Sequence, residues 1–118
     1  MEMERPDRAG QAYRLALKDN PLLPSALHGY GRYLVSGGHT KKAISYFERA
    51  IRAKPNLAES YYELAKLYEN TDTVKSINFY RQFQKLVKLD PEFLDQKAKS
   101  KDRVSYLKKT VAPDALKL

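Results

Sequence analysis

The chain has 118 residues, of which 42% are hydrophobic, 31% charged and 11% aromatic. This is enough apolar surface for one modest core, which excludes a wholly disordered chain. There is no cysteine, which excludes disulfides, thiolate nucleophiles and cysteine-ligated metal sites. No apolar run is long enough to span a bilayer, and the first ten residues are too charged for a secretory signal. We therefore expect an intracellular, cytoplasmic protein.

The net charge of +8 is concentrated in two stretches. Residues 24–57 carry six basic side chains and one acidic, and residues 91–118 carry seven basic and four acidic, whereas residues 1–23 and 58–90 are balanced. Basic stretches of this kind suit an acidic protein surface, nucleic acid or anionic lipid, and they also occur on solvated helix faces.

The first predicted element is a helix over residues 4–19. Its Ala9, Tyr13 and Ala16, with Pro21 beyond its end, have a spacing that recurs 34 residues later. The spacing indicates the second helix of a hairpin whose first helix is missing. Two explanations stay open: the chain is cut from a longer array, or this helix is a natural N-terminal cap.

Residues 24–55 predict a helical hairpin. Two apolar stripes with helical spacing are separated by Gly37 and Gly38, and the second ends before Pro55. The stripes consist of Leu27, Tyr30, Gly31 and Leu34, and of Ala43, Phe47 and Ala50. Gly31 and Ala43 are small where the two helices must approach closely, and the larger side chains fill the space beside them. Neither helix could bury its stripe alone, so neighbouring hairpins must stack on it.

This block resembles a tetratricopeptide repeat (TPR), whose pattern is W-x₂-L-G-x₂-Y, then A-x₃-F, then P. The slots are taken in order by Leu27, Tyr30, Gly31, Leu34, Ala43, Phe47 and Pro55. Leu27 replaces the Trp and Leu34 the Tyr, and both changes conserve size and character. The resemblance implies an all-α fold, a right-handed α-solenoid of antiparallel TPR helix hairpins with a C-terminal capping helix.

Residues 58–90 repeat the pattern as a second hairpin. Tyr61, Leu64, Ala65 and Tyr68 form its first stripe, residues 70–73 its turn, and Ser76, Tyr80 and Phe83 its second stripe. The turn is one residue shorter and Pro91 comes about three residues late, so we expect the second helix to be nearly one turn longer than in the first hairpin. Spacing counted back from Pro91 would instead bury Phe79, Phe83 and Leu86, and both registers stay open.

The C-terminal part predicts a capping helix over residues 92–111, followed by a loose tail over residues 113–118. The apolar positions of the helix are Phe93, Leu94, Ala98, Val104, Leu107 and Val111, and the wet positions are Lys97, Lys99, Lys101 and Arg103. No small-residue pair marks another hairpin. We therefore predict a single TPR-like domain over residues 1–112.

The resemblance also implies that the first helix of each hairpin lines a concave groove that binds a peptide or a partner subunit. The groove positions are Ser25, His28, Arg32 and Val35 in the first hairpin and Glu59, Tyr62, Lys66 and Glu69 in the second. Since these sets are 34 residues apart, Arg32 and Lys66 are predicted to be neighbours, as are His28 and Tyr62. Two adjacent cations favour an acidic or C-terminal segment, although polar residues are also ordinary on exposed helix faces.

Some TPR co-chaperones clamp the terminal carboxylate of heat-shock chaperones with Lys and Asn on successive first helices. Here those slots hold His28 and Arg32, then Tyr62 and Lys66, and the slot for the next Asn holds Gly29 or Glu63. A glutamate there would repel a carboxylate, so the sequence predicts that this clamp is missing.

Lys41, Lys42, Arg49 and Arg52 are predicted to form a basic outer face on the second helix of the first hairpin. It suggests two alternative functions. One is self-assembly or docking into a larger complex, through this face and the N-terminal helix. The other is electrostatic contact with nucleic acid or an anionic surface, which rests on charge alone because the usual nucleic-acid-binding motifs are missing.

The sequence does not predict an enzyme. There are two histidines, of which His39 falls in a turn and His28 has no acidic partner near it in sequence. The pair Glu59 and Glu63 has a spacing common on wet helix faces. With no cysteine and no carboxylate cluster, we expect neither a metal site nor a cofactor.

Overall fold

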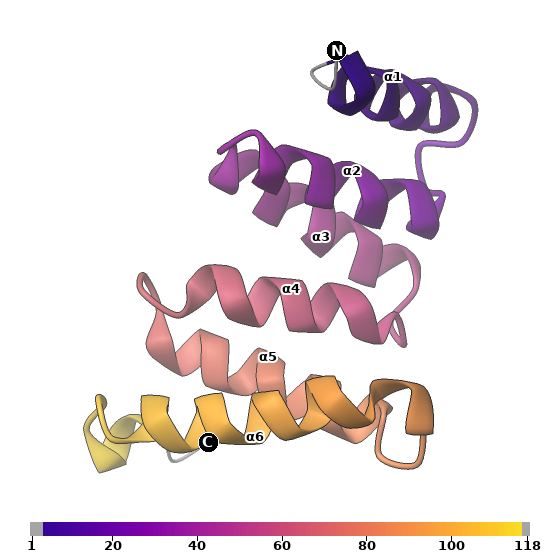
Figure 1. Cartoon of the computed structure of the whole chain (residues 1–118). Coiled ribbons are helices and arrows are strands. Elements are labelled where there is room, and N and C mark those ends of the chain that lie inside the picture. Colours follow the sequence, from indigo (N-terminus) through magenta and orange to yellow (C-terminus); the bar gives the residue numbers. More distant parts are fainter. Residues whose placement is uncertain (1–3, 117–118) are drawn as a thin grey trace. The chain divides into compact units, whose positions relative to one another are not determined.

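A computed structural model describes residues 4–116, and within this range the regular structure is helical throughout (Figure 1). The α-helices are α1 (Glu4–Asp19), α2 (Pro24–Ser36), α3 (Thr40–Ala53), α4 (Ala58–Tyr68), α5 (Thr73–Leu86) and α6 (Leu94–Lys108), with short 3-10 helices at Pro91–Phe93 and Pro113–Leu116. The chain divides into two compact units between Ser60 and Tyr61, within α4, and each unit is described by itself. None of the described helices is both long and apolar enough to cross a membrane.

The antiparallel hairpin of α2 and α3 closes on the predicted apolar stripes (Figure 1). Ala43, Phe47 and Ala50 are fully buried. A Cβ atom added to Gly31 would lie 2.8 to 3.0 Å from ring atoms of Phe47, so only glycine allows this close approach. Between the helices, Gly38 has a φ of +81°, a left-handed conformation that glycine adopts without strain.

One residue of the first stripe differs from the prediction. Tyr30 was expected to fill the interior of the hairpin, yet it is only half-buried. Its ring stacks on Tyr33, with centroids 5.7 Å apart, and meets the edge of Tyr46 at 4.8 Å. The hydroxyl group explains this placement, since a tyrosine keeps its polar end near water.

Helix α1 packs on α2 through two reciprocal pairs of glycine and tyrosine. A Cβ atom on Gly10 of α1 would lie 2.5 Å from the ring of Tyr33, and one on Gly29 of α2 would lie 2.3 Å from the ring of Tyr13. Each tyrosine therefore lies in the space that the opposite glycine leaves open. Helix α1 is thus an integral part of the first unit.

The α4–α5 hairpin adopts the first of the two registers considered above. Ser76, Ile77, Tyr80 and Phe83 are buried on α5, whereas Leu86 is 39% exposed. The prediction of a longer second helix is wrong, because α5 and α3 both have 14 residues. The late Pro91 instead follows a turn and begins a 3-10 helix, which the Asp90 side chain caps by accepting the backbone N–H of Glu92 at 3.0 Å.

Helix α6 and the segment after it complete the second unit. Ser100 and Leu107 of α6 are buried, and Leu107 joins a core cluster with Ala65, Ile77 and Tyr80. Leu116 also packs against this cluster, so the prediction of a loose tail fails over residues 113–116; residues 117–118 lie outside the described part. The sequence suggested no partner for Leu116 because no repeat spacing reaches that far.

Candidate functional site

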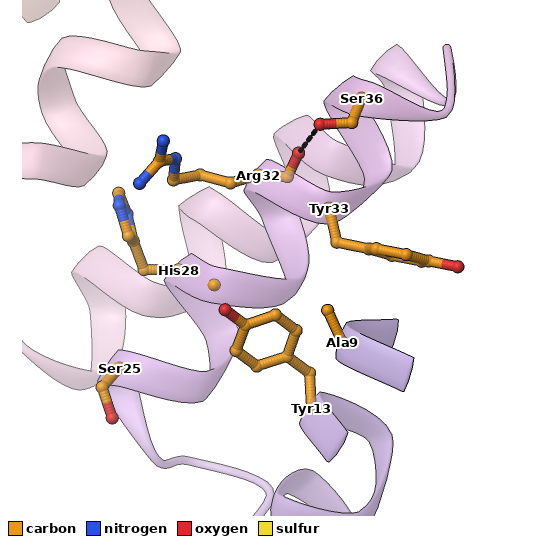
Figure 2. Close-up of a pocket in the computed structure, with 8 residues that line it drawn as sticks. Ala9, Tyr13, Ser25, His28, Arg32, Tyr33 and Ser36 are labelled. Atoms are coloured by element: carbon orange, nitrogen blue, oxygen red, sulfur yellow. Dashed lines mark hydrogen bonds between the residues drawn. The ribbon is translucent and has the colours of Figure 1, made fainter. Parts of the chain in front are cut away.

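A surface pocket of about 440 Å³ lies where α1 and α2 meet (Figure 2). We call it the Arg32 pocket; it is lined by Ala9 and Tyr13 from α1 and by Ser25, His28, Gly29, Arg32, Tyr33 and Ser36 from α2. It contains three of the predicted groove residues. None of the lining residues is acidic, so the pocket presents a cation and two tyrosine rings to whatever enters it.

His28 is held in place on one side of this pocket. Its Nδ1 atom lies 2.8 Å from the Oγ of Ser60, which is fully buried at the start of α4. Its ring also lies against Phe47, with centroids 5.3 Å apart. Because both contacts orient the imidazole, His28 forms a fixed wall of the pocket.

Arg32 is exposed, and its guanidinium makes no hydrogen bond or ion pair with any residue that the structure describes. Figure 2 shows Arg32 and His28 projecting from the same side of α2, while the ring of Tyr33 extends away from them. The hydroxyl of Ser36 donates to the backbone carbonyl of Arg32 at 3.2 Å. An unengaged guanidinium beside aromatic rings is well suited to pair with a carboxylate.

The second unit has its own pocket of about 340 Å³, which we call the Tyr62 pocket. It is lined by Tyr62, Lys66, Glu69, Tyr80, Lys99, Asp102 and Arg103. Its charges are of both signs and largely paired. Lys66 lies 3.3 Å from the Glu63 carboxylate and 5.1 Å above the ring of Tyr62, so this cation is already engaged within the unit.

Glu69 is the centre of a hydrogen-bond network in the Tyr62 pocket. Its carboxylate accepts hydrogen bonds from the Tyr80 hydroxyl at 2.5 Å and from the Arg103 guanidinium, whose Nε lies 3.2 Å away. Burial opposes ionisation, but these hydrogen bonds outweigh it and lower the pKa of Glu69. Burial, followed by the bond to Glu69, raises the pKa of the Tyr80 hydroxyl. Glu69 therefore connects α4 to α5 and α6.

The predicted groove residues thus fall into two groups. Ser25, His28 and Arg32 line one pocket, and Tyr62, Lys66 and Glu69 line the other. Glu59 is exposed in the first turn of α4 and lines neither, and Val35 is 36% exposed on α2. The predicted pairs Arg32 with Lys66 and His28 with Tyr62 join residues of different units and stay predictions.

Tyr13, Tyr33 and Arg103 are among the pocket residues that were not predicted as site residues from the sequence. Tyr13 was assigned only to the stripe of α1, Tyr33 was assigned no role, and Arg103 was expected to stay wet. A signal existed for Arg103, since it follows Glu69 by 34 residues, the period of the repeat. On both α1 and α2 a glycine precedes a tyrosine by about one helical turn, Gly10 before Tyr13 and Gly29 before Tyr33. This shared pattern could have indicated that the two tyrosines pack between the helices.

The predicted basic outer face contains one residue with a structural role. Lys41, Lys42 and Arg52 are exposed on α3, but Arg49 is half-buried. Its guanidinium lies 4.7 Å from the ring centroid of Tyr46 and donates to the backbone carbonyl of Pro21 at 3.4 Å. Arg49 therefore also anchors the α1–α2 loop. Among residues 8–112 and 114–116, no three His, Asp or Glu side chains gather as metal ligands would.

The repeat is recognised independently by comparison with known proteins. Residues 24–67 match the family model described as tetratricopeptide repeat. No curated protein matches the whole sequence significantly.

Solved structures match the fold closely at low sequence identity. The type III secretion translocator chaperone SycD of Yersinia enterocolitica has a TM-score of 0.84 at 12% identity, covering 92% of this chain and 76% of that chain. SycD in complex with a peptide of the translocator YopD gives the same score and identity, with 84% of that chain covered. PcrH in complex with the chaperone-binding region of PopD has a TM-score of 0.81 at 12% identity, covering 92% and 83%.

The family match spans α2, α3 and almost all of α4, the region whose slots carry the resemblance. The structural matches extend the fold over most of the chain. Residues 24–67 are therefore a tetratricopeptide repeat segment, in a chain with an all-helical, TPR-like α-solenoid fold.

Proposed function

We propose that this chain is a protein-interaction scaffold that binds a peptide segment of a partner protein, with the Arg32 pocket as the main contact. The observation that carries the proposal is the unengaged Arg32 guanidinium in a pocket with aromatic walls and no acidic lining residue. Tyrosine and arginine are the residue types most enriched at energetically important interface positions. A carboxylate of the partner would form a charge-assisted hydrogen bond with Arg32.

The structural relatives support this class of partner. SycD binds a peptide of YopD, and PcrH binds the chaperone-binding region of PopD. Both are proteins of this fold that hold a segment of another protein. The likeness supports a peptide as the partner of this chain. The sequence of that peptide can be found by selection from a peptide library.

The two pockets would contribute unequally. In the Tyr62 pocket Lys66 is engaged by Glu63, and the Glu69 carboxylate would repel an acidic residue. We therefore expect an acidic residue of the partner to enter the Arg32 pocket. The Tyr62 pocket would contribute mainly the ring surface of Tyr62.

A selection experiment tests the proposal. A phage-displayed library of random 12-residue peptides is selected on the wild-type chain, and the recovered peptides are measured by fluorescence anisotropy. We expect Arg32→Glu to weaken their binding by about tenfold or more, since losing one charge-assisted contact costs about 1.4 kcal/mol or more. The matched control is Arg52→Glu, the same charge reversal on an exposed position of α3. Equal weakening by both variants, or none by Arg32→Glu, would contradict the proposal.

A second candidate function is docking or assembly through α1, and one comparison favours it. Ala43, Phe47 and Ala50 of α3 are fully buried, and Phe47 packs against Gly31 of α2. The corresponding residues of α1, Ala9, Tyr13 and Ala16, are only half-buried. A helix from another molecule could cover this stripe as α2 covers that of α3.

Molar mass by multi-angle light scattering, measured across a hundredfold concentration range, tests assembly. A rise toward the dimer mass that Ala16→Glu abolishes would support it, because a charge on the half-buried stripe would oppose packing of a second helix. Ala53→Glu, which adds the same charge at an exposed position of α3, is the control. A constant monomer mass would exclude self-assembly through α1.

A further inference from the structure

Another pocket of the first unit is also lined by Tyr33, and Lys42 is the one of its lining residues that the sequence predicted as part of a site. It has a volume of about 410 Å³ and lies among α1, α2 and the start of α3. We call it the Tyr30 pocket; it is lined by Arg14, Tyr30, Tyr33, Leu34, Ser36, Gly37, His39 and Lys42. Tyr33 and Ser36 line both this pocket and the Arg32 pocket. The ring of Tyr33 also packs against Gly10 of α1.

The charges around this pocket have one sign. Arg14 and Lys42 are cations from two different helices, His39 adds an imidazole, and no lining residue is acidic. Lys42 forms no ion pair with any described residue. Among the described residues, the Arg14 guanidinium donates to the hydroxyl of Tyr30, at 3.4 Å, and also interacts with the hydroxyl of Tyr33. Neither cation is therefore paired with a carboxylate of the described residues, and an anion could pair with both.

The walls of the pocket are aromatic and partly exposed. Tyr30 and Tyr33 are stacked, with an angle of 12° between their ring planes, and both are half-buried. Tyr30 occupies a slot where the repeat pattern has leucine, and its ring also contacts Tyr46. Two stacked rings held in place by a third provide a preorganised surface on which another planar or apolar side chain can pack.

We propose that the Tyr30 pocket is a second protein-binding site, which takes an acidic residue together with an adjacent aromatic residue of a partner segment. The carboxylate pairs with Arg14 and Lys42, and the aromatic ring packs on Tyr30 and Tyr33. The pocket volume of about 410 Å³ lies in the range of small-ligand pockets. A pocket of this size can hold two side chains of a partner segment. The site shares Tyr33 and Ser36 with the Arg32 pocket but has its own cations, and its test does not require the Arg32 pocket to bind.

The experiment uses the full chain and a fluorescein-labelled peptide with the core Glu-Phe-Asp-Phe between Gly-Ser ends. Binding is measured by anisotropy at low salt, with two comparison peptides in which the acids are replaced by their amides or the Phe residues by Ala. The test variant is Arg14→Glu with Lys42→Glu. The matched control is Lys18→Glu with Lys41→Glu, which changes the same net charge on the same two helices outside the pocket.

We expect the acidic aromatic probe to bind and to shift the backbone amide signals of Gly37 and His39 in two-dimensional NMR spectra. The test variant should bind it about tenfold or more weakly, whereas the control should stay within about threefold, because only the former places carboxylates in the pocket. Both comparison peptides should bind more weakly than the probe. Gly37 and His39 line this pocket and not the Arg32 pocket, so shifts at these two residues separate the two sites.

Several results would overturn the proposal. The first is that the wild-type chain does not bind the probe. The second is that the test and control variants weaken probe binding equally. The third is that the amide peptide binds as tightly as the probe. Unchanged binding of the Ala peptide would show that the tyrosines play no part. Displacement of the probe by millimolar inorganic phosphate, with no displacement by equimolar chloride, would identify a phosphate site instead of an acidic-segment site.

Discussion

The hairpins α2–α3 and α4–α5 pack their two helices together at equivalent positions of the repeat, but with residues of different chemistry. Gly31, Ala43 and Phe47 make an apolar contact in the first. Their counterparts in the second are Ala65, Ser76 and Tyr80, two of which carry a hydroxyl. Both hydroxyls are satisfied: that of Ser76 donates to the Ala65 carbonyl at 2.6 Å, and that of Tyr80 donates to Glu69.

The difference shows how a small change in the repeat determines which residues remain available for binding. A buried hydroxyl needs an acceptor, and Glu69 supplies it for Tyr80. The partly buried carboxylate then needs a cation, which Arg103 of α6 supplies. In the first hairpin the position equivalent to Glu69 is Val35, so no such network forms. Arg32 is left without a partner within the described chain.

The largest expected effect comes from removing the apolar contact. Phe47→Ala should lower the free energy of unfolding by about 3–5 kcal/mol, because the ring is fully buried and Gly31 cannot fill the cavity. Urea denaturation followed by circular dichroism measures this loss. A change below about 1 kcal/mol would show that Phe47 does not hold the hairpin closed.

Introducing the hydrogen-bonded pair of the second hairpin into the first tests whether the two hairpins are equivalent at these positions. Phe47→Tyr should cost about 1–3 kcal/mol, since the new hydroxyl has no carboxylate acceptor at position 35. Adding Val35→Glu should recover about 1 kcal/mol, by recreating the pair of Tyr80 and Glu69. A double-mutant cycle in urea gives this coupling. If the two changes are additive, the equivalence of the hairpins at these positions is wrong.

The network at Glu69 should make stability depend on pH. Because its pKa is lowered on folding, Glu69 stabilises the protein above the ordinary carboxyl value of 4.5, and this contribution is lost as the pH falls through the folded pKa. Glu69→Gln should cost about 1–2 kcal/mol at pH 7, a figure reduced because the Arg103 side chain is 44% exposed. The difference from wild type should shrink below about pH 4. A constant difference from pH 7 to pH 3 would contradict this role.

The smallest effect is expected on the outer face. Arg52→Glu should change the free energy of unfolding by less than about 0.5 kcal/mol, because the side chain is exposed and has no partner among the described residues. Arg49→Glu should cost more, since Arg49 contacts Tyr46 and the Pro21 carbonyl. Equal costs in thermal melts would show that Arg49 does not anchor the loop.

Much of the fold could be predicted because the repeat constrains it. The helical spacing of the apolar residues indicated the first hairpin, and the sizes of Gly31, Ala43 and Phe47 indicated where its helices approach closely, since close helix packing requires small residues beside a large one. The register of α5 could not be chosen, because Phe79, Tyr80, Phe83 and Leu86 are all large and apolar enough to be buried. Which of these side chains are buried depends on contacts with α6 and Leu116, and these contacts cannot be predicted from the local sequence pattern.

The candidate site was harder to predict than the fold. The spacing predicted groove residues on each first helix, and Ser25, His28 and Arg32 line one pocket. That they bind a partner stays a prediction. Spacing could not show that Glu69 is engaged by Tyr80 and Arg103, because that depends on side-chain hydrogen bonds between three helices. It also could not show that Tyr30 and Tyr33 stack beside a second pocket.

The most direct test of the peptide-binding proposal is to map where a library-selected peptide binds, by two-dimensional NMR of the labelled full chain. We predict that the largest amide shifts occur in the two segments that line the Arg32 pocket, residues 9–13 and 25–36, and that Arg32→Glu removes them. Shifts concentrated on α3 around Lys41 and Arg52, and unchanged in Arg32→Glu, would contradict the proposal. They would place the contact on the basic outer face.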